Sequence, residues 1–330
     1  MANLLIKGAT SGTTTLAAVD NVTATITLPA TTGVFPVQDS ATGALYLPAG
    51  TTAQRPTAVT GQWRYNTDLG VLEYYNGSAW YSVTGTYNAP PTVEYLVVAG
   101  GGGSGYDWGA PGGGGGYRTA TGFAVSPGSA ITVTVGSGGA GRANGSNSVF
   151  STITSVGGGC GGGGSTSPSS GGSGGAGQRG GSGAAGTSGQ GNAGGASVSW
   201  SIGGAGGAGA AGTAAVGATP GLGGAGLQSS ISGTATYYAG GGTGFGTTNG
   251  LAPYTNGTTG LGRTANQTNG ATNSGSGGGQ GDNLLGGSGI VIIRYADTYL
   301  AAASTTGSPT ITVAGGYRVY KWTGSGTITF

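Results

Sequence analysis

Short runs of alternating apolar and polar residues occupy both ends of this chain and predict β-strands. The runs are rich in threonine, valine, isoleucine and aromatic residues, which is typical of strands. No segment has the 3.6-residue periodicity of an amphipathic helix, so the pattern predicts an all-β protein. The predicted strands cover residues 4–6, 13–17, 22–28, 62–66, 71–75, 80–83, 94–98, 123–125, 131–135, 290–295, 310–313, 317–322 and 327–330.

The region 36–84 is predicted to be a small β module with its own turns. Thr67–Gly70 separates two of its strands, and Asn76-Gly77 is the dipeptide favoured in two-residue type I′ hairpins. Its aromatic residues are expected to form a small core, and an exposed face that binds sugars is the alternative. These residues are Trp63, Tyr65, Tyr74 and Trp80.

The centre of the chain follows a different period, because glycine recurs at every third position. One run extends from Gly171 to Gly189 and a second from Gly203 to Gly212. A period of three matches the polyproline-II geometry, in which one row of the helix then lacks side chains and can lie against another backbone. We therefore expect polyglycine-II helices that hydrogen-bond to one another. A single helix over Gly171–Gly189 would be about 60 Å long, so a turn is expected within it.

These patterns divide the chain into four regions. Residues 1–35 are an N-terminal strand region, and residues 36–84 are the aromatic β module. Residues 85–295 form a glycine-rich domain, in which a β platform carries a polyglycine insertion over 157–289. Residues 296–330 form a C-terminal β hairpin segment, and the apolar Phe330 suggests that its last strand is docked.

Composition narrows the range of functions. Only 5% of the residues are charged and the net charge is +2, which gives no general affinity for nucleic acid. Between Trp108 and Gly281 there are arginines but no acidic residue. This stretch either favours an anionic surface such as lipopolysaccharide or only carries solubilising charges. No apolar run is long enough to cross a bilayer, and the N-terminus lacks the core of a signal peptide, so we expect assembly in a bacterial cytoplasm.

Catalytic chemistry has few candidate residues in this sequence. There is no histidine, Cys160 is the only cysteine, and the eight carboxylates are dispersed. The Gly100-x-Gly102-x-x-Gly105 spacing resembles a dinucleotide loop, but more glycines follow where that motif needs a helix. We therefore expect no enzyme activity, no cofactor and no metal site.

Recognition is the chemistry that remains, and aromatic residues that interrupt the glycine-rich region are its candidates. Bulky rings do not fit the packed rows of glycine helices, so we expect them in turns, on an outer face or between layers. Exposed rings offer apolar contact at low entropic cost. The alternative is that the rings only cap and seal the stack. The candidate receptor-binding residues are Tyr106, Trp108, Tyr117, Arg142, Arg179, Trp200, Tyr237, Tyr238, Phe245 and Tyr254.

Several segments resemble structural proteins of bacteriophage particles. The opening ATSGTTTLAA resembles short strand repeats of phage fibre proteins, and AGTTAQRPTAVTGQWRYNTDLGVLEYYNGSAW is similar to a module that recurs in phage structural proteins. The segments YLVVAGGGGSG, ITVTVGSGGAG and GGSGIVIIRYA resemble glycine-rich domains of phage tail fibres. Tip adhesins of T-even-like phages carry a polyglycine-II sandwich with receptor-binding loops at its distal end.

The resemblance implies a non-enzymatic virion protein, a homotrimer in a tail fibre or fibre tip that binds the host surface. Its N-terminal region would dock to other virion proteins, and its glycine-rich domain would contact a bacterial surface glycan or an outer-membrane protein. The segments around Trp108, Trp200 and Tyr237-Tyr238 correspond to the candidate loops. Fibre-like modules before the glycine block and the extra C-terminal segment depart from these adhesins. A capsid decoration or head-fibre protein with a structural role is therefore the alternative.

Overall fold

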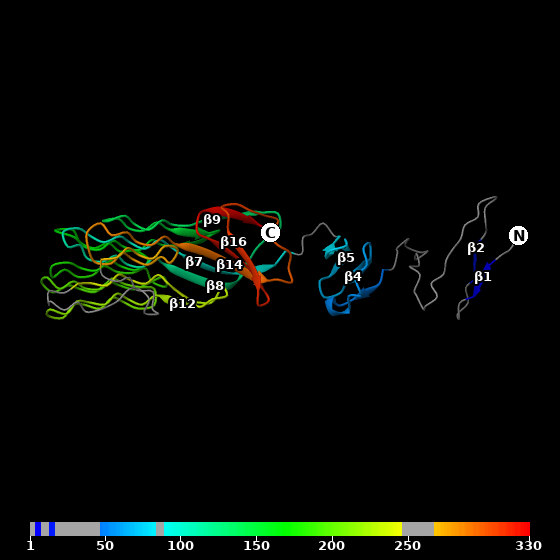
Figure 1. Cartoon of the computed structure of the whole chain (residues 1–330), viewed down its shortest axis with the longest axis horizontal. Helices are drawn as coiled ribbons and strands as arrows, with labels where there is room; N and C mark the ends of the chain where they lie inside the picture. The colour runs from blue at the N-terminus through cyan, green and yellow to red at the C-terminus, as the bar shows by residue number, and fades with distance from the viewer. Residues whose placement is uncertain (1–3, 8–12, 17–46, 84–88, 246–266) are drawn as a thin grey trace. The chain divides into compact units, whose positions relative to one another are not determined.

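The computed structural model describes residues 4–7, 13–16, 47–83, 89–245 and 267–330. The chain divides into two compact units, Met1–Val83 and Thr84–Phe330 (Figure 1). The described residues form β-strands and extended segments, with one 3-10 turn at Thr52–Gln54 and no α-helix. The predicted all-β fold class is confirmed, whereas the predicted strand 22–28 lies outside the described residues.

The described residues of the first unit form two small sheets. β1 (Leu4–Lys7) pairs with β2 (Thr13–Leu16) in antiparallel fashion. The second sheet has the strand order β3 (Ala49–Gly50), β4 (Trp63–Asn66), β5 (Val71–Tyr75) and β6 (Trp80–Ser82).

The second sheet of this unit buries the face that the sequence predicted to be exposed. Trp63 and Tyr65 are 47% and 42% exposed, so they do not form the expected aromatic core. The alternation along β4 instead buries Arg64 and Asn66. Both contact the buried carboxylate of Glu73. The Glu73 charge must be paired because an unpaired buried charge is strongly destabilising.

The loop after β5 also differs from the predicted type I′ hairpin. Tyr75 pairs with Trp80, which leaves a four-residue loop between the two strands. The Asn76 side-chain oxygen accepts hydrogen bonds from the backbone N–H groups of Ser78 and Ala79, both at 2.9 Å. This local side-chain bond replaces the backbone turn that the dipeptide predicts.

The strands of the second unit form two five-stranded sheets and a hairpin. The first sheet has the order β16 (Thr310–Ala314), β17 (Tyr317–Trp322), β14 (Ile290–Ala296), β7 (Thr92–Val98) and β8 (Tyr117–Ala124). The second has the order β11 (Ile153–Ser155), β10 (Ser148–Phe150), β9 (Ala130–Thr134), β18 (Gly326–Thr329) and β15 (Ser304–Thr305). The hairpin consists of β12 (Leu227–Ser229) and β13 (Thr236–Tyr238).

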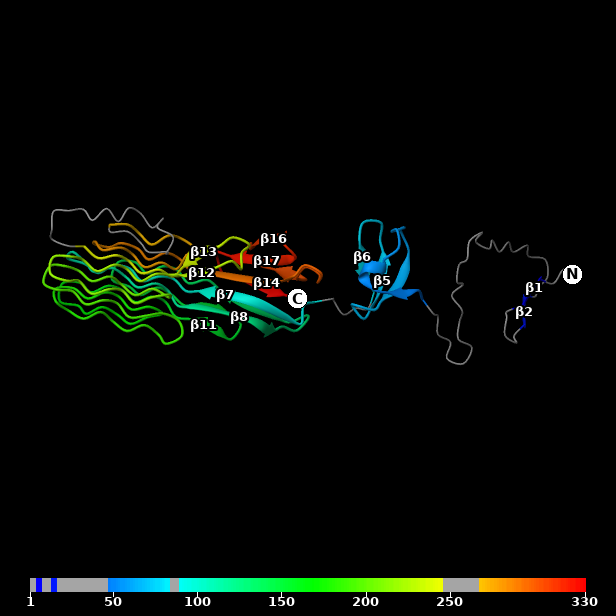
Figure 2. The same cartoon turned by 90° about the horizontal axis from the view of Figure 1, so that it is seen from below.

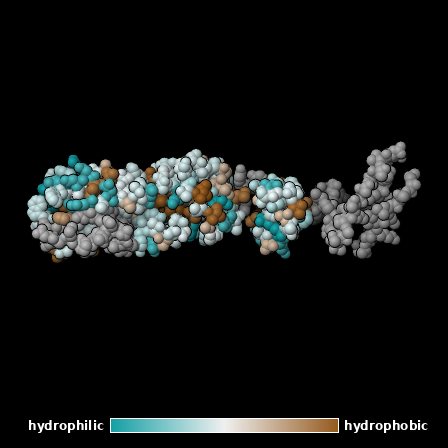
Figure 3. All heavy atoms as spheres, viewed as in Figure 1, coloured by the Kyte–Doolittle hydropathy of each residue, from teal (hydrophilic) through white to brown (hydrophobic). Residues whose placement is uncertain are grey.

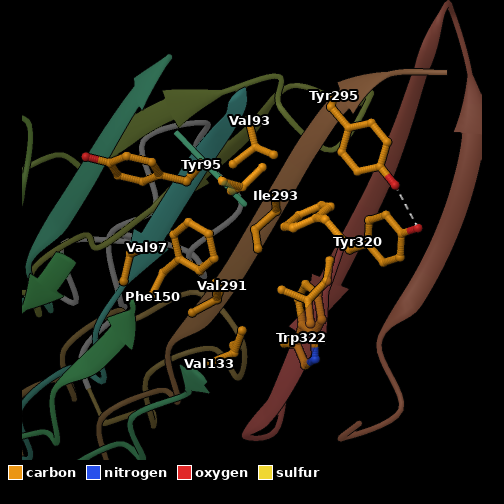
Figure 4. Close-up of a cluster of buried hydrophobic side chains, with 13 residues drawn as sticks. Val93, Tyr95, Val97, Val133, Phe150, Val291, Ile293, Tyr295, Tyr320 and Trp322 are labelled. Carbon is orange, nitrogen blue, oxygen red and sulfur yellow. Dashed lines mark hydrogen bonds between the residues drawn. The ribbon is translucent and has the colours of Figure 1, made fainter. Parts of the chain in front are cut away.

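A hydrophobic core joins the two sheets (Figure 4). Its largest side chains include Tyr95, Tyr320 and Trp322 from the first sheet and Phe150 and Ile328 from the second. A second cluster lies on the other face of the first sheet, where the β12–β13 hairpin packs. β7 and β14 are therefore buried on both faces, which explains their uninterrupted apolar runs.

The C-terminal segment 296–330 is part of this sandwich. β17 pairs with β14, and β18 pairs with β9, so the last strands complete both sheets. The terminal Phe330 is only 1% exposed. The segment therefore differs from the separate C-terminal region that the sequence suggests.

Extended glycine-rich segments, here called the glycine rods, run from these strands and lie side by side (Figure 2). They begin directly after β7, earlier than the predicted insertion at residue 157. The first rod contains Gly100, Gly102 and Gly105, whose spacing resembles a dinucleotide loop. The rods cover residues 99–105, 110–116, 136–140, 143–147, 156–163, 166–171, 173–177, 181–187, 191–198, 201–208, 211–216, 219–226, 239–245, 275–281 and 284–289.

The hydrogen bonds of the rods repeat every three residues. Successive backbone N–H groups of rod 99–105 donate to rods 110–116, 143–147 and 284–289 in turn, and the same partners recur three residues later. Three residues per turn is the repeat of the polyproline-II helix. Because each rod bonds to neighbours in several directions, the stack satisfies its buried backbone groups without a continuous sheet.

The close approach of the rods requires glycine. A Cβ on Gly102 would lie 2.2 Å from the carbonyl oxygen of Gly159, and one on Gly113 would lie 2.3 Å from that of Ser173. The run Gly171–Gly189 does contain the expected turn, at Arg179 and Gly180.

Candidate functional site

Tight turns join the glycine rods at the end of the second unit that is farthest from its strands (Figure 1). Reciprocal backbone hydrogen bonds between Val198 and Ser201 close one of them, and its two central residues are Ser199 and Trp200. We call these segments the distal turns. They comprise residues 106–109, 141–142, 164–165, 178–180, 199–200, 217–218 and 282–283.

Several distal turns hold non-glycine residues in the left-handed backbone region. Asp107 and Trp108 do so consecutively, with φ of 56° and 59°, and Arg179 and Ser199 have φ of 51° and 49°. Each costs roughly 1–2 kcal/mol relative to the usual conformations. Such strain persists only where the surroundings over-determine it, and it is concentrated at functional sites.

Two glutamines hold the strained turn at Trp108. The side-chain N–H groups of Gln178 donate to the carbonyl oxygens of Asp107 and Trp108, at 2.5 and 3.1 Å. Gln280 donates to the Trp108 carbonyl at 3.2 Å. Both glutamines are buried, with 9% and 1% exposure. The indole of Trp108 is therefore presented on a fixed backbone.

Aromatic side chains from separate turns and rods surround a cavity of about 210 Å³, which we call the tip cavity. The indoles of Trp108 and Trp200 are 60% and 61% exposed, and the ring centroids of Trp108 and Phe245 are 6.3 Å apart. Exposed hydrophobic side chains also occur elsewhere at this end, among hydrophilic ones (Figure 3). The tip cavity is lined by Trp108, Gln178, Arg179, Ser199, Trp200, Ile202, Phe245 and Gln280.

Arg179 fixes one wall of the tip cavity. Its guanidinium forms an ion pair with the Asp107 carboxylate at 2.6 Å and lies 5.1 Å from the ring centroid of Trp200. Exposed ion pairs contribute little to stability. The ion pair with Asp107 instead compensates the charge of Arg179, and the guanidinium orients the indole of Trp200.

The buried glutamines also carry unsatisfied acceptors. Among the described residues, the side-chain oxygens of Gln178 and Gln280 have no hydrogen-bond partner. Their N–H groups face backbone carbonyls, which fixes the orientation of both amides. An unpaired buried acceptor costs about 1–3 kcal/mol, so holding the Trp108 turn in this way lowers the stability of the stack.

A second hollow of about 250 Å³ adjoins the same tryptophan. Trp108 and Gln280 line both hollows, and Asp282 belongs to the second. The Asp282 carboxylate accepts a hydrogen bond from the Gly109 backbone at 3.3 Å. Trp108 thus separates two concave surfaces.

Tyr106 and Arg142 also lie at distal turns but outside the tip cavity. The Arg142 guanidinium lies 4.5 Å from the ring centroid of Tyr106. Arg142 is exposed, with a left-handed φ of 69°. These two residues form a neighbouring cationic and aromatic patch.

The remaining candidates lie elsewhere. Tyr117 and Tyr238 are 8% and 4% exposed in the cluster under the first sheet, which removes them from the set of surface contact residues. Burial raises the pKa of both phenols. Tyr237 is half-buried on β13, and Tyr254 lies outside the described residues. Sequence spacing did not separate these tyrosines from the tip residues because all of them interrupt glycine-rich stretches.

Sequence reasoning missed the two glutamines of the tip cavity. Both stand directly after glycine at the end of a rod, in the contexts AGQRG and GGQGD. A glutamine that directly follows a glycine run and precedes a turn is the sequence signal that could have identified them. Asp107, one of the eight dispersed carboxylates, pairs with Arg179 and was not predicted as a tip residue either.

The described part of the chain holds neither a candidate metal cluster nor a membrane-spanning helix. Within those ranges, no group of histidine, cysteine or acidic side chains gathers as a metal site requires. The same part of the chain contains no helix that is long and apolar enough to span a bilayer. The chemistry of the tip is that of aromatic and amide contact.

Comparison with known proteins identifies the central part of the chain. No curated protein and no solved structure matches it. A family model described as a glycine-rich domain matches residues 78–296, which include all of the rods and the tip cavity. This chain therefore belongs to the glycine-rich domain family.

Proposed function

We propose that this protein is a non-enzymatic structural component of a bacteriophage particle. In this proposal it belongs to a tail fibre or fibre tip and binds the host cell surface through its distal turns. The observation that carries the proposal is the pair of exposed indoles, Trp108 and Trp200, beside the tip cavity. Tryptophan and arginine are enriched among the residues that dominate binding energy.

The arrangement of the second unit supports this role. The glycine rods form a stack held by backbone hydrogen bonds, and the side chains available for recognition occupy its distal turns. A rigid scaffold with binding residues on its end loops lowers the entropic cost of binding. The N-terminal strands would dock to other virion proteins, and the assembled fibre would be a homotrimer.

Locating the protein on intact particles tests the proposal. Antibodies raised against the chain should label purified phage particles, at the end of a tail fibre, in electron micrographs. Deletion of residues 1–35 should remove the protein from particles, because this region is proposed to dock it. Label on the capsid would instead support the decoration or head-fibre alternative, and normal incorporation of the deletion variant would contradict N-terminal docking.

A further inference from the structure

The sheet of strands β3–β6 in the first unit exposes one of its two faces. Residues directly opposite each other on paired antiparallel strands share a face, and Trp63, Tyr74 and Tyr81 are opposite one another across β4, β5 and β6. Tyr65 and Leu72 form a second pair on the same face. We call these five residues the aromatic face. Its side chains of Trp63, Tyr65 and Tyr81 are each more than two-fifths exposed.

The rings of the aromatic face lie against one another. The ring centroids of Trp63 and Tyr74 are 5.4 Å apart and the rings are stacked, and the centroids of Tyr74 and Tyr81 are 5.9 Å apart. The five residues of the face include no charged side chain. A contiguous exposed apolar patch on a folded protein marks an interaction surface.

The opposite face of this sheet does not supply a hydrophobic core. Among the described residues 47–83, Val71 is the only buried apolar side chain. The other buried side chains in this range are Arg64, Asn66 and Glu73, which contact one another as described above. The sheet therefore buries little apolar surface within one chain, and its largest apolar side chains remain on the aromatic face.

A module of this size needs a further source of stability. Domains below about 40 residues usually depend on disulfides, metals or association with other chains. Residues 1–83 contain no cysteine and no histidine, so disulfides and the thiol and imidazole ligands of structural metal sites are not available to this unit. Association is the source that remains. It must cover the aromatic face permanently, because the stability of the sheet depends on it.

We propose that the aromatic face packs against the same face of other copies of this chain. A copy is present wherever the chain folds, as permanent cover requires. A face that meets itself must be self-complementary. An uncharged aromatic surface meets this condition, because its copies do not repel one another and aromatic rings attract in offset and edge-to-face arrangements. That three copies meet rests on the proposed function, whereas the choice of face rests on the sheet alone.

A glycan is the alternative partner of the aromatic face. A sugar stacks on the flat surface of an aromatic ring, and the mutual stacking of Trp63 and Tyr74 covers part of that surface. Reversible binding of a sugar would also not give the sheet permanent cover. These two arguments favour other copies of the chain, and sugar binding is an outcome of the test.

Two measurements on the purified full chain test the inference together. Sedimentation equilibrium gives the mass of the assembly, and hydroxyl-radical footprinting read by mass spectrometry gives the oxidation rate of each tryptophan. We expect an oligomer in which Trp63 is oxidised at least about fivefold more slowly than Trp108 and Trp200, because the core of an interface excludes water. The two tip indoles are the internal reference, since they are also exposed in the single chain.

Lysine variants assign the interface to the aromatic face. Tyr65→Lys combined with Tyr81→Lys places two charges on this face, at side chains that are exposed in the single chain. An unpaired buried charge is strongly destabilising, so we expect the dissociation constant of the oligomer to rise at least about a hundredfold. Val59→Lys is the control, because it adds the same charge at an exposed apolar residue of the same unit, outside the strands. It should leave the dissociation constant unchanged.

Three results would overturn the inference. They are a monomeric chain at micromolar concentration, an oligomer in which Trp63 is oxidised as fast as the tip indoles, and an unchanged dissociation constant in the double lysine variant. A monomer with slow oxidation of Trp63 would mean that the chain covers the face itself. A monomer in which only added dextran slows that oxidation would assign the face to sugar binding.

The same measurements separate this inference from the proposed function. An oligomer of three chains with a freely oxidised Trp63 would leave the proposed homotrimer standing and remove the aromatic face as its interface. Protection of Trp63 in an oligomer whose antibodies do not label phage particles would have the opposite meaning. The interface would then stand and the virion role would not.

Discussion

At the residue scale, glycine decides where the rods pack, and the residues between the rods decide what the protein presents. The three-residue period of Gly171–Gly189 predicted extended helices, and the hydrogen bonds of the rods repeat with this period. The period alone did not predict burial of the interrupting rings. Trp200 lies in a two-residue turn and is exposed, whereas Tyr238 is the last residue of hairpin strand β13 and packs under a sheet.

Replacing a packed glycine tests the close contact of the rods. We expect Gly113→Ala to lower the free energy of unfolding by about 2–3 kcal/mol or more, because its Cβ would overlap the Ser173 carbonyl oxygen. Gly324→Ala is the matched control, since a Cβ there meets nothing within 4 Å. Chemical denaturation measures both variants. Equal stability of the two variants would contradict direct packing of rod against rod.

Tyr295 predicts that the second unit loses stability at alkaline pH. Its hydroxyl hydrogen-bonds with that of Tyr320 at 3.0 Å (Figure 4). Burial, followed by the bond to Tyr320, raises the pKa of Tyr295. The folded state thus holds this proton more tightly than the unfolded chain, whose tyrosine pKa is about 10. The stabilisation is complete below that pH and is lost as the pH rises above it.

A pH titration of stability checks this expectation. The free energy of unfolding should fall between about pH 9 and 11, and Tyr295→Phe should make that fall shallower. Tyr117 and Tyr238 keep part of the pH dependence, because burial also raises their pKa values. An identical slope in the variant would show that Tyr295 does not contribute.

At the element scale, hydrophobic patterning located the strands better than it assigned their faces. The predicted strands 71–75 and 317–322 match β5 and β17. The expected core of the first unit was wrong because aromatic and polar residues alternate along β4, so either set could have been buried. Which face is buried depends on Glu73 of the neighbouring strand, and single-strand patterns do not contain that information.

The buried charges around Glu73 predict that replacing this residue strongly destabilises the first unit. Glu73→Gln removes the charge that compensates Arg55 and Arg64, so we expect a loss of about 3–5 kcal/mol. Asp68→Asn makes the same chemical change at an exposed residue and should cost less than about 1 kcal/mol. Hydrogen exchange of the β4 and β5 amides measures the local stability of this unit. Similar exchange in both variants would mean that the Glu73 network contributes little.

At the scale of the whole molecule, the sequence indicated a β platform with a glycine-rich excursion, and the second unit has both parts. The rods extend over more of the chain than predicted, from residue 99 to 289, because glycine rods also follow β7 and β9. The tip cavity was not predictable from spacing. It combines side chains from residues 108 to 280 that only the folded stack brings together.

The central claim is that the distal turns form the surface that contacts the host. Its most direct test is the adsorption rate of particles carrying the double replacement Trp108→Ala and Trp200→Ala. Particles carrying Ile311→Ala are the control, since this apolar side chain is 49% exposed on β16, away from the distal turns. We predict that the double variant adsorbs at least about tenfold more slowly and that the control is unchanged. Normal adsorption by double-variant particles of normal composition would contradict the claim.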